Sequence, residues 1–212
     1  MITCGVDELL DWVDVRNSAI LVVDVQNDYC HEDGCFARGN FDVSFGQKMV
    51  PDLNKFLTEA RKCKVPILHI QSIHGKWTNS PVWISRHRRT NIDADKMLQP
   101  DSWGVEFYKV LPRPNDYIVA KHRYSAFVDT ELDVVLRSQG IKTIIVAGVL
   151  TNVCVELTAW HGFMKDYYVV VLEDCTAACS TEDHETALVS MGKSFVIATS
   201  ATAVEALRRA KN

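Results

Sequence analysis

"KTIIVAGVLTNVCVELTAW", residues 142–160, joins an apolar, β-branched run to a helical pattern through a short turn. The run at 142–148 predicts a strand buried on both faces. Residues 151–165 then predict a helix with Cys154 in its first turn. A buried strand followed closely by a helix is the repeating unit of a parallel α/β fold. This stretch therefore decides the fold class and also places a thiol near the end of a strand.

The same alternation of apolar runs and helical patterns recurs along the chain. Near-continuous apolar strands between helices indicate a mostly parallel sheet that is covered on both faces. We therefore expect a single domain, residues 1–212, built as a three-layer α/β/α sandwich around a six-stranded sheet. Thr130 is the predicted N-cap of a helix at 129–140. The other expected strands are residues 19–26, 65–72, 116–122, 167–174 and 195–200, and the other expected helices are 52–64, 181–193 and 201–212.

The composition is that of an ordinary globular chain. The 212 residues are 47% apolar and 24% charged, and the net charge of −4 provides no basic field for nucleic acid or anionic lipid. The apolar runs are shorter than the roughly 20 residues of a membrane span, and the first residues lack a signal-peptide pattern. The seven cysteines show no disulfide framework or metal-finger spacing. We expect a cytoplasmic protein without nucleic-acid or membrane partners.

The segment 73–115 breaks the alternation. It is polar, rich in aromatic residues and weakly periodic. Long excursions inside a compact domain usually have a function. We expect this one to form a lid or a pocket wall, and the alternatives are a surface insertion or a subunit contact.

Three polar residues stand at or just after the ends of predicted strands. Ligands of parallel sheets bind beyond the carboxyl ends of the strands, which is where Asp24, Lys121 and Cys154 are expected. A thiol at a helix start, beside an ammonium, is favoured as thiolate. A neighbouring carboxylate can take the thiol proton and return it to a leaving amine. Taken singly, each residue is more often structural: a small buried thiol, a turn-forming carboxylate or a paired lysine.

Three motifs in order resemble one known family. "LVVDVQNDY" (21–29), "AKHRYSAF" (120–127) and "GVLTNVCVELTA" (148–159) resemble the D-x-Q-x-D-F/Y, K-x-x-x-S-A-F and G-x-x-T-x-x-C-V segments of the isochorismatase-like cysteine hydrolases. The resemblance spans residues from about 15 to 200. It implies a Rossmann-like sandwich and an oligomer, which we expect to be a homodimer or a homotetramer.

The resemblance also implies roles for individual residues. Asp24, Lys121 and Cys154 would be the catalytic set. The peptide bond between Val149 and Leu150 would be cis, and the N–H groups of Leu150 and Cys154 would form an oxyanion hole.

The nicotinamidases of this family carry a metal-binding pattern that resembles D-x-H-x-x-x-H. The matching stretch here is "SIHGKWT" (72–78), in which Ser72 replaces the carboxylate and Thr78 replaces the second histidine. His74 alone remains, and a lone imidazole is a poor metal site. We therefore expect no metal and no other cofactor.

Cys154 also separates the chain from isochorismatases proper, which often lack that cysteine. The motifs most resemble the branch of ureidoacrylate, N-carbamoylsarcosine and biuret amidohydrolases. We expect a cysteine-dependent amidohydrolase that cleaves a C–N bond of a small amide or ureido (carbamoyl) compound. It would release ammonia or an amine through a thioester-like intermediate. The alternatives are a nicotinamidase-like or isochorismatase-like hydrolase, or a non-catalytic binding protein on the same fold.

Several residues near these motifs are candidates for contact with the substrate. Tryptophans would wall the pocket, an arginine would pair with a substrate carboxylate, and amide side chains would hydrogen-bond the substrate. The alternatives are core packing for the tryptophans and a solvated patch for "RHRR" (86–89). The main candidates are Gln26, Asn27, Trp77, Trp83, Arg86, Tyr124 and Phe127, with Trp103, Arg88 and Arg89 as further ones.

Overall fold

A parallel sheet of six strands organises the protein, in the order β3-β2-β1-β4-β5-β6. The computed structural model describes residues 3–88 and 90–211. The predicted three-layer sandwich with a six-stranded parallel sheet is confirmed. The strands are β1 (Ser18–Val23), β2 (Ile67–Ser72), β3 (Tyr117–Lys121), β4 (Thr143–Val149), β5 (Tyr168–Ala177) and β6 (Val196–Ala198).

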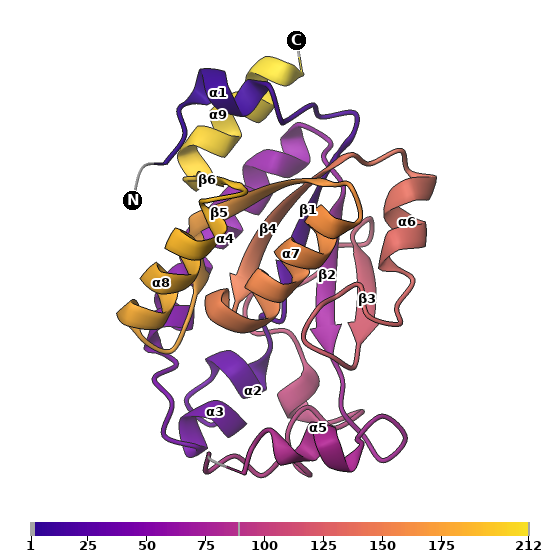
Figure 1. The fold of residues 1–212 in the computed structure, drawn as a ribbon, viewed down its shortest axis with the longest axis vertical. Coiled ribbons are helices and arrows are strands. Elements are labelled where there is room, and N and C mark those ends of the chain that lie inside the picture. Colours follow the sequence, from indigo (N-terminus) through magenta and orange to yellow (C-terminus); the bar gives the residue numbers. More distant parts are fainter. Residues whose placement is uncertain (1–2, 89, 212) are drawn as a thin grey trace.

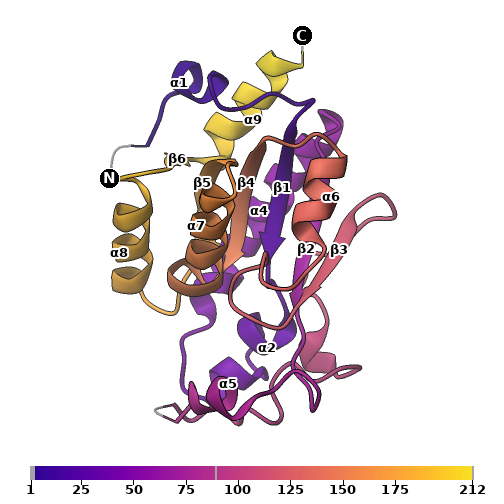
Figure 2. The same cartoon turned by 45° about the vertical axis from the view of Figure 1, so that its right-hand side comes forward.

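Helices cover both faces of this sheet (Figures 1 and 2). Neighbouring side chains of β1 point to opposite faces, so Ile20 packs toward α4 and α9 while Leu21 packs toward α6, α7 and α8. The helices are α1 (Val6–Leu10), α2 (Asn27–Cys30), α3 (Cys35–Arg38), α4 (Ser44–Lys62), α5 (Pro81–Ser85), α6 (Leu132–Ser138), α7 (Glu156–Met164), α8 (Thr181–Met191) and α9 (Ser200–Ala210), with a 3₁₀ turn η1 (Trp103–Val105) and a π-helical turn η2 (Thr151–Val155). Within residues 3–88 and 90–211, no helix has both the length and the apolar character of a membrane span.

Helix α4 begins earlier than predicted. It starts at Ser44 rather than at residue 52 and contains Pro51. The first two turns bury Gly46 and Met49, and this burial stabilises a segment that proline would otherwise weaken.

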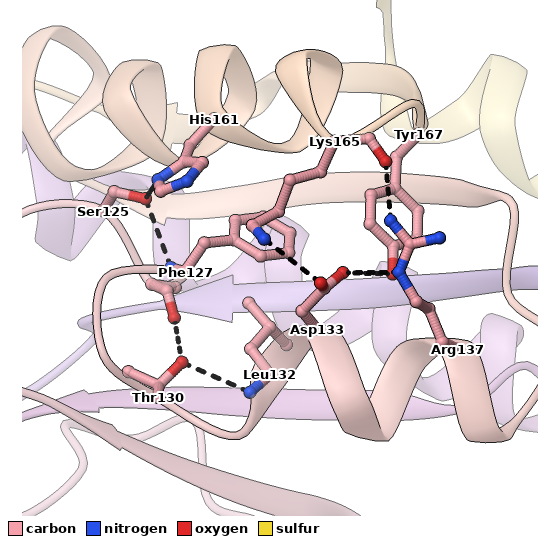
Figure 3. Close-up of polar contacts among 10 residues, drawn as sticks. Ser125, Phe127, Thr130, Leu132, Asp133, Arg137, His161, Lys165 and Tyr167 are labelled. Carbon is pink, nitrogen blue, oxygen red and sulfur yellow. Dashed lines mark hydrogen bonds and ion pairs between the residues drawn. The ribbon is translucent and has the colours of Figure 1, made fainter.

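The start of α6 also differs by one residue from the prediction. The N-cap is Glu131, and Thr130 acts from the position before it. The Thr130 hydroxyl accepts the Leu132 N–H at 3.2 Å and donates to the Ala126 carbonyl at 2.5 Å (Figure 3). Thr130 therefore still satisfies a free N–H of the first turn, although a loop residue separates it from the helix.

Two strand ends approach each other closely at the centre of the sheet. Gly148 of β4 lies opposite Val23 of β1, and a Cβ on Gly148 would stand 2.1 Å from the Val23 carbonyl oxygen. Gly148 has φ +112°, and Asp24, which follows Val23, has φ +53°. Only glycine allows this approach, because any side chain there would overlap the neighbouring backbone.

Most of the excursion 73–115 lies beyond the carboxyl ends of the strands, together with α2 and α3 (Figure 1), and its last residues return along the sheet to the start of β3. The Leu98 N–H donates to Asp28 Oδ2 at 2.6 Å, and the His74 N–H donates to the Leu98 carbonyl at 2.9 Å. The excursion is therefore attached to the segment that follows β1, and it covers the edge of the sheet where a site was predicted.

Candidate active site

The three residues predicted at the strand ends meet at one point. Asp24 follows β1, Lys121 ends β3, and Cys154 lies in the η2 turn after β4. Lys121 Nζ is 2.8 Å from Asp24 Oδ2 and 3.4 Å from Cys154 Sγ. All three side chains are buried. A carboxylate, an ammonium and a thiol are thus held in contact away from solvent.

Ser72 explains how Lys121 reaches Asp24, and the sequence reasoning had not given it a role. Strand β2 lies between β1 and β3, and Ser72 is the residue of β2 opposite Lys121. Its side chain is small enough for the lysine to pass. Its hydroxyl donates to Asp24 Oδ1 at 3.1 Å, which fixes the carboxylate.

Lys121 is held as an ammonium. Its Nζ donates to the Arg123 carbonyl at 3.0 Å and to Cys154 Sγ, and it forms an ion pair with Asp24. Burial opposes its charge, but the charges of Asp24 and Cys154 outweigh burial and raise the pKa of Lys121.

Cys154 rests as a thiol, which differs from the expectation of a stabilised thiolate. Burial raises the pKa of Cys154, the Lys121 charge lowers it, and Asp24 raises it again, with a net increase. The Asp24 Oδ2 contact with Lys121 is an ion pair that is not aligned as a hydrogen bond, so this oxygen remains an available acceptor. The thiol therefore needs a base, and an acceptor oxygen lies beside it.

The turn that carries Cys154 is not the start of an α-helix, as predicted, but the π-helical turn η2. The N–H groups of Val153 and Val155 both donate to the Leu150 carbonyl at 3.1 Å, whereas Cys154 does not donate to it. The Val149–Leu150 peptide bond is cis, as the family resemblance implied. On the far side of the turn, Thr151 Oγ1 and His184 Nδ1 of α8 are 2.8 Å apart.

Two amide candidates have internal partners. Gln26 Nε2 donates to the carbonyls of Ser72 and Val105 at 2.9 and 2.8 Å, and its Oε1 accepts the Ser72 N–H at 2.8 Å. Asn27 Nδ2 donates to the Trp103 carbonyl at 2.8 Å. The prediction that these side chains contact substrate is wrong for Gln26, whose donors and acceptor are already bonded. Both residues instead tie the excursion to the end of β1.

Trp77 and Phe127 are also wrong as substrate contacts. Trp77 is 94% exposed, so it forms no wall of a buried site. Phe127 is buried between α6 and α7 (Figure 3). The centroid of its ring lies 5.5 Å from that of His161 and 5.8 Å from that of Tyr167. Among the further candidates, Trp103 packs edge-on against His31, Arg88 is exposed, and Arg89 lies outside the described residues.

The remaining candidates lie together beside the three central residues. The ring of Trp83 is 4.7 Å from Tyr124 and 5.4 Å from His74, and the Arg86 guanidinium stacks on Trp83 at 3.9 Å. Burial raises the pKa of Tyr124 and lowers the pKa of Arg86. Trp83 and Tyr124 also line an apolar pocket of about 440 Å³ that reaches α7.

Tyr29 was not predicted as a site residue, although it is the last residue of the first motif. It is buried, and its hydroxyl interacts with Ser72. Burial raises the pKa of Tyr29, and the charges of Cys154 and Asp24 raise it further. The hydroxyl therefore stays protonated beside Ser72. The aromatic position of the D-x-Q-x-D-F/Y motif was the available signal.

His74 is a neutral imidazole. Burial, followed by the charges of Arg86 and Lys121, lowers its pKa to about 3. In the part of the chain that the structure describes, no three His, Cys, Asp or Glu side chains are grouped as metal ligands.

Comparison with known proteins places the chain in a family. Residues 18–203 match the model of the isochorismatase domain. Ureidoacrylate amidohydrolase RutB of Methylobacterium radiotolerans is 33% identical over 196 residues, covering 86% of this chain and 76% of that protein. A cysteine hydrolase from Pseudomonas syringae pv. phaseolicola has a TM-score of 0.84 and 27% identity, covering 93% of this chain and 95% of the other.

N-carbamoylsarcosine amidase of Thermoplasma acidophilum shares the fold, with a TM-score of 0.70 and 24% identity over 87% of this chain and 96% of its own. The protein belongs to the isochorismatase domain family. The predictions of this family and of a hydrolase are confirmed.

Proposed function

We propose that the protein is a cysteine-dependent amidohydrolase that cleaves a C–N bond of a small amide or ureido compound and releases ammonia or an amine. The observation that carries the proposal is the buried contact of Lys121 with both Asp24 and Cys154. The name of the RutB relative, an amidohydrolase of ureidoacrylate, supports this class of bond.

The first chemical step forms the bond between enzyme and substrate. Asp24 Oδ2 takes the proton of Cys154 Sγ while the sulfur attacks the carbonyl carbon. The carbonyl π electrons move to oxygen, and the N–H groups of Leu150 and Cys154 hold this oxyanion. Proton transfer and attack occur together, because the raised pKa of Cys154 disfavours a free thiolate.

The second step breaks the C–N bond. The oxyanion reforms the carbonyl, and the nitrogen leaves with the proton that Asp24 had accepted. The product is ammonia or an amine, and Cys154 keeps a thioester-type carbonyl group. Water then attacks this group with Asp24 as base, and the proton returns to sulfur. Lys121 remains charged throughout and balances the negative charge that alternates between Asp24 and the oxyanion of the substrate.

The test is ammonia release from a panel of ureido acids, biuret, N-carbamoyl amino acids, nicotinamide and simple amides. Wild type should release ammonia from at least one ureido compound or amide. Cys154→Ala should abolish this release, and Cys154→Ser should nearly abolish it, because a serine alkoxide is much harder to form at neutral pH. Cys63→Ala is the matched control, since Cys63 is another buried thiol at the end of α4.

Activity of Cys154→Ala near that of wild type would refute the mechanism. Two further measurements separate it from the alternatives. Loss of activity with a chelator would favour metal-assisted, nicotinamidase-like chemistry. Hydrolysis of a vinyl ether that survives thiol alkylation would favour isochorismatase-like chemistry.

We also propose that the protein is a homodimer or a homotetramer. The support is apolar surface at the end of α7, where Phe163 is 48% and Met164 71% exposed. Light scattering after gel filtration measures the mass, and a monomer at micromolar concentration would refute this proposal.

A further inference from the structure

Two arginines share the ring of one tryptophan beside the candidate nucleophile. The Arg86 guanidinium lies 3.9 Å from the centroid of the Trp83 ring, and the Arg123 guanidinium lies 4.9 Å from it. Arg86 follows α5 in the excursion, and Arg123 follows β3. Segments far apart in the chain thus bring two positive charges to one place.

Neither charge has an anionic partner. Arg86 Nη1 donates to the Trp83 carbonyl, and Arg123 Nη1 donates to the carbonyls of Thr78 and His122. Across residues 3–88 and 90–211, no carboxylate lies within 4.0 Å of either guanidinium. These hydrogen bonds use Nη1 alone, so Nε and Nη2 of both side chains can bind a ligand. An Nε–Nη2 edge is the geometry that binds a carboxylate through two parallel hydrogen bonds.

Both arginines are connected to the reacting groups. The Arg123 carbonyl accepts from Lys121 Nζ at 3.0 Å, and the same nitrogen is 3.4 Å from Cys154 Sγ. Arg86 stacks on the Trp83 ring, which lies 4.7 Å from the ring of Tyr124, the residue after Arg123. Both arginine side chains therefore gather around the segment that directly follows Lys121.

The charge balance of this region calls for an anion. Asp24 neutralises Lys121, and neutral His74 adds no charge. Arg86 and Arg123 are both partly buried, and they leave two positive charges without compensation. Charges withdrawn from water are costly unless they are paired. A bound anion would supply that pairing.

We propose that Arg86 and Arg123 form a clamp for a carboxylate of the substrate, so that the protein acts on ureido or amide carboxylic acids rather than on neutral amides. The inference rests on the proposed hydrolysis at Cys154 and deepens it. The clamp holds the acid end of the molecule while the carbonyl to be attacked lies against the sulfur. Trp83, Tyr124 and Arg123 line an apolar pocket of about 440 Å³, which would receive the apolar part of the acid.

The experiment compares each acid with its methyl ester. The probes are N-carbamoylglycine, N-carbamoyl-β-alanine and ureidoacrylate, each tested as free acid and as ester, with ammonia as the readout. Wild type should prefer the acids. Arg86→Gln and Arg123→Gln should each lower kcat/KM for the acid about 10- to 100-fold, mainly through KM, because each removes hydrogen bonds to a charged group. Activity on the esters should change little.

Two controls separate binding from structure. Arg88→Gln removes an exposed arginine two residues from Arg86 and should leave both substrate types unaffected. Arg86→Lys keeps the charge but loses the planar fork, so it should restore only part of the acid preference. A variant that loses activity equally on acids and esters reports altered packing around Trp83 and argues against a clamp.

A calorimetric binding measurement tests the same preference when turnover is too slow to compare. Cys154→Ala protein should bind the acids in calorimetry more tightly than the esters, and adding Arg86→Gln should remove this difference. If wild type hydrolyses acids and esters equally, the clamp is refuted while the proposed C–N hydrolysis stands. If no acid is preferred in either turnover or binding, the clamp is likewise refuted.

Discussion

Replacing Gly148 by alanine should weaken both the fold and the site. Gly148 has φ +112°, which an alanine adopts at a cost of about 1–3 kcal/mol. The new Cβ would lie 2.1 Å from the Val23 carbonyl oxygen and 2.7 Å from its nitrogen. Both atoms belong to a central strand, so the backbone must shift, and such overpacking costs about another 1–3 kcal/mol. The sum, about 2–6 kcal/mol, is a large part of the roughly 5–15 kcal/mol that stabilises a typical protein.

Urea unfolding followed by circular dichroism measures this loss. With a slope of about 2–3 kcal/mol per molar urea, the midpoint should fall by about 0.7–3 M. Activity should fall too, since Val23 precedes Asp24 and Gly148 lies two residues before Leu150. Gly140→Ala is the matched control, because Gly140 has φ +67° with nothing within 4 Å of a new Cβ. It should cost only about 1–2 kcal/mol. Equal losses in the two variants would refute the argument from close approach.

Three more substitutions have definite expected results. Asp24→Asn should lower kcat about 10²- to 10⁴-fold in steady-state kinetics, because the thiol loses its base; unchanged kcat would contradict that role. His74→Gln should reduce the decrease in the free energy of unfolding that wild type shows as the pH falls. An unfolded imidazole takes up a proton below about pH 6.5, whereas folded His74 does so only near its pKa of about 3, so stability present above pH 6.5 is lost between these values. Wild type should lose about 2 kcal/mol of unfolding free energy through His74 at pH 5. Urea unfolding at pH 7 and pH 5 measures this loss, and an equal loss in wild type and His74→Gln would contradict the prediction. Trp77→Ala should change kcat/KM less than about twofold, since this ring is 94% exposed; a tenfold fall would restore Trp77 to the site.

The layers and the strands were predictable because burial leaves a strong pattern in the sequence. Each strand of the sheet centre is a run of apolar residues, and each covering helix repeats its apolar positions. The boundaries were less predictable. The first turns of α4 end at Pro51, a residue that argues against a helix interior, and only their packing shows that they are helical. The π-helical form of η2 likewise has no periodic signal in five residues.

Asp24, Lys121 and Cys154 could be brought together from the sequence because the carboxyl ends of parallel strands share one edge. Their supporting residues could not. Ser72 contacts Asp24 across 48 positions of the chain, and a serine at a strand end carries no signal of that contact. Gln26 shows the opposite error, because an amide that hydrogen-bonds backbone carbonyls has the same chemistry as one that binds substrate.

The sheet supplies the reacting groups, whereas the connections between strands supply Arg86 and Arg123. Asp24 and Lys121 stand at positions set by the register of β1, β2 and β3, and Cys154 follows β4 directly. Arg86 lies in the connection 73–115, and Arg123 lies in the connection from β3 to α6. Under the proposed function, the groups that break the C–N bond are thus positioned by the sheet, whereas the two arginines are positioned by the connections.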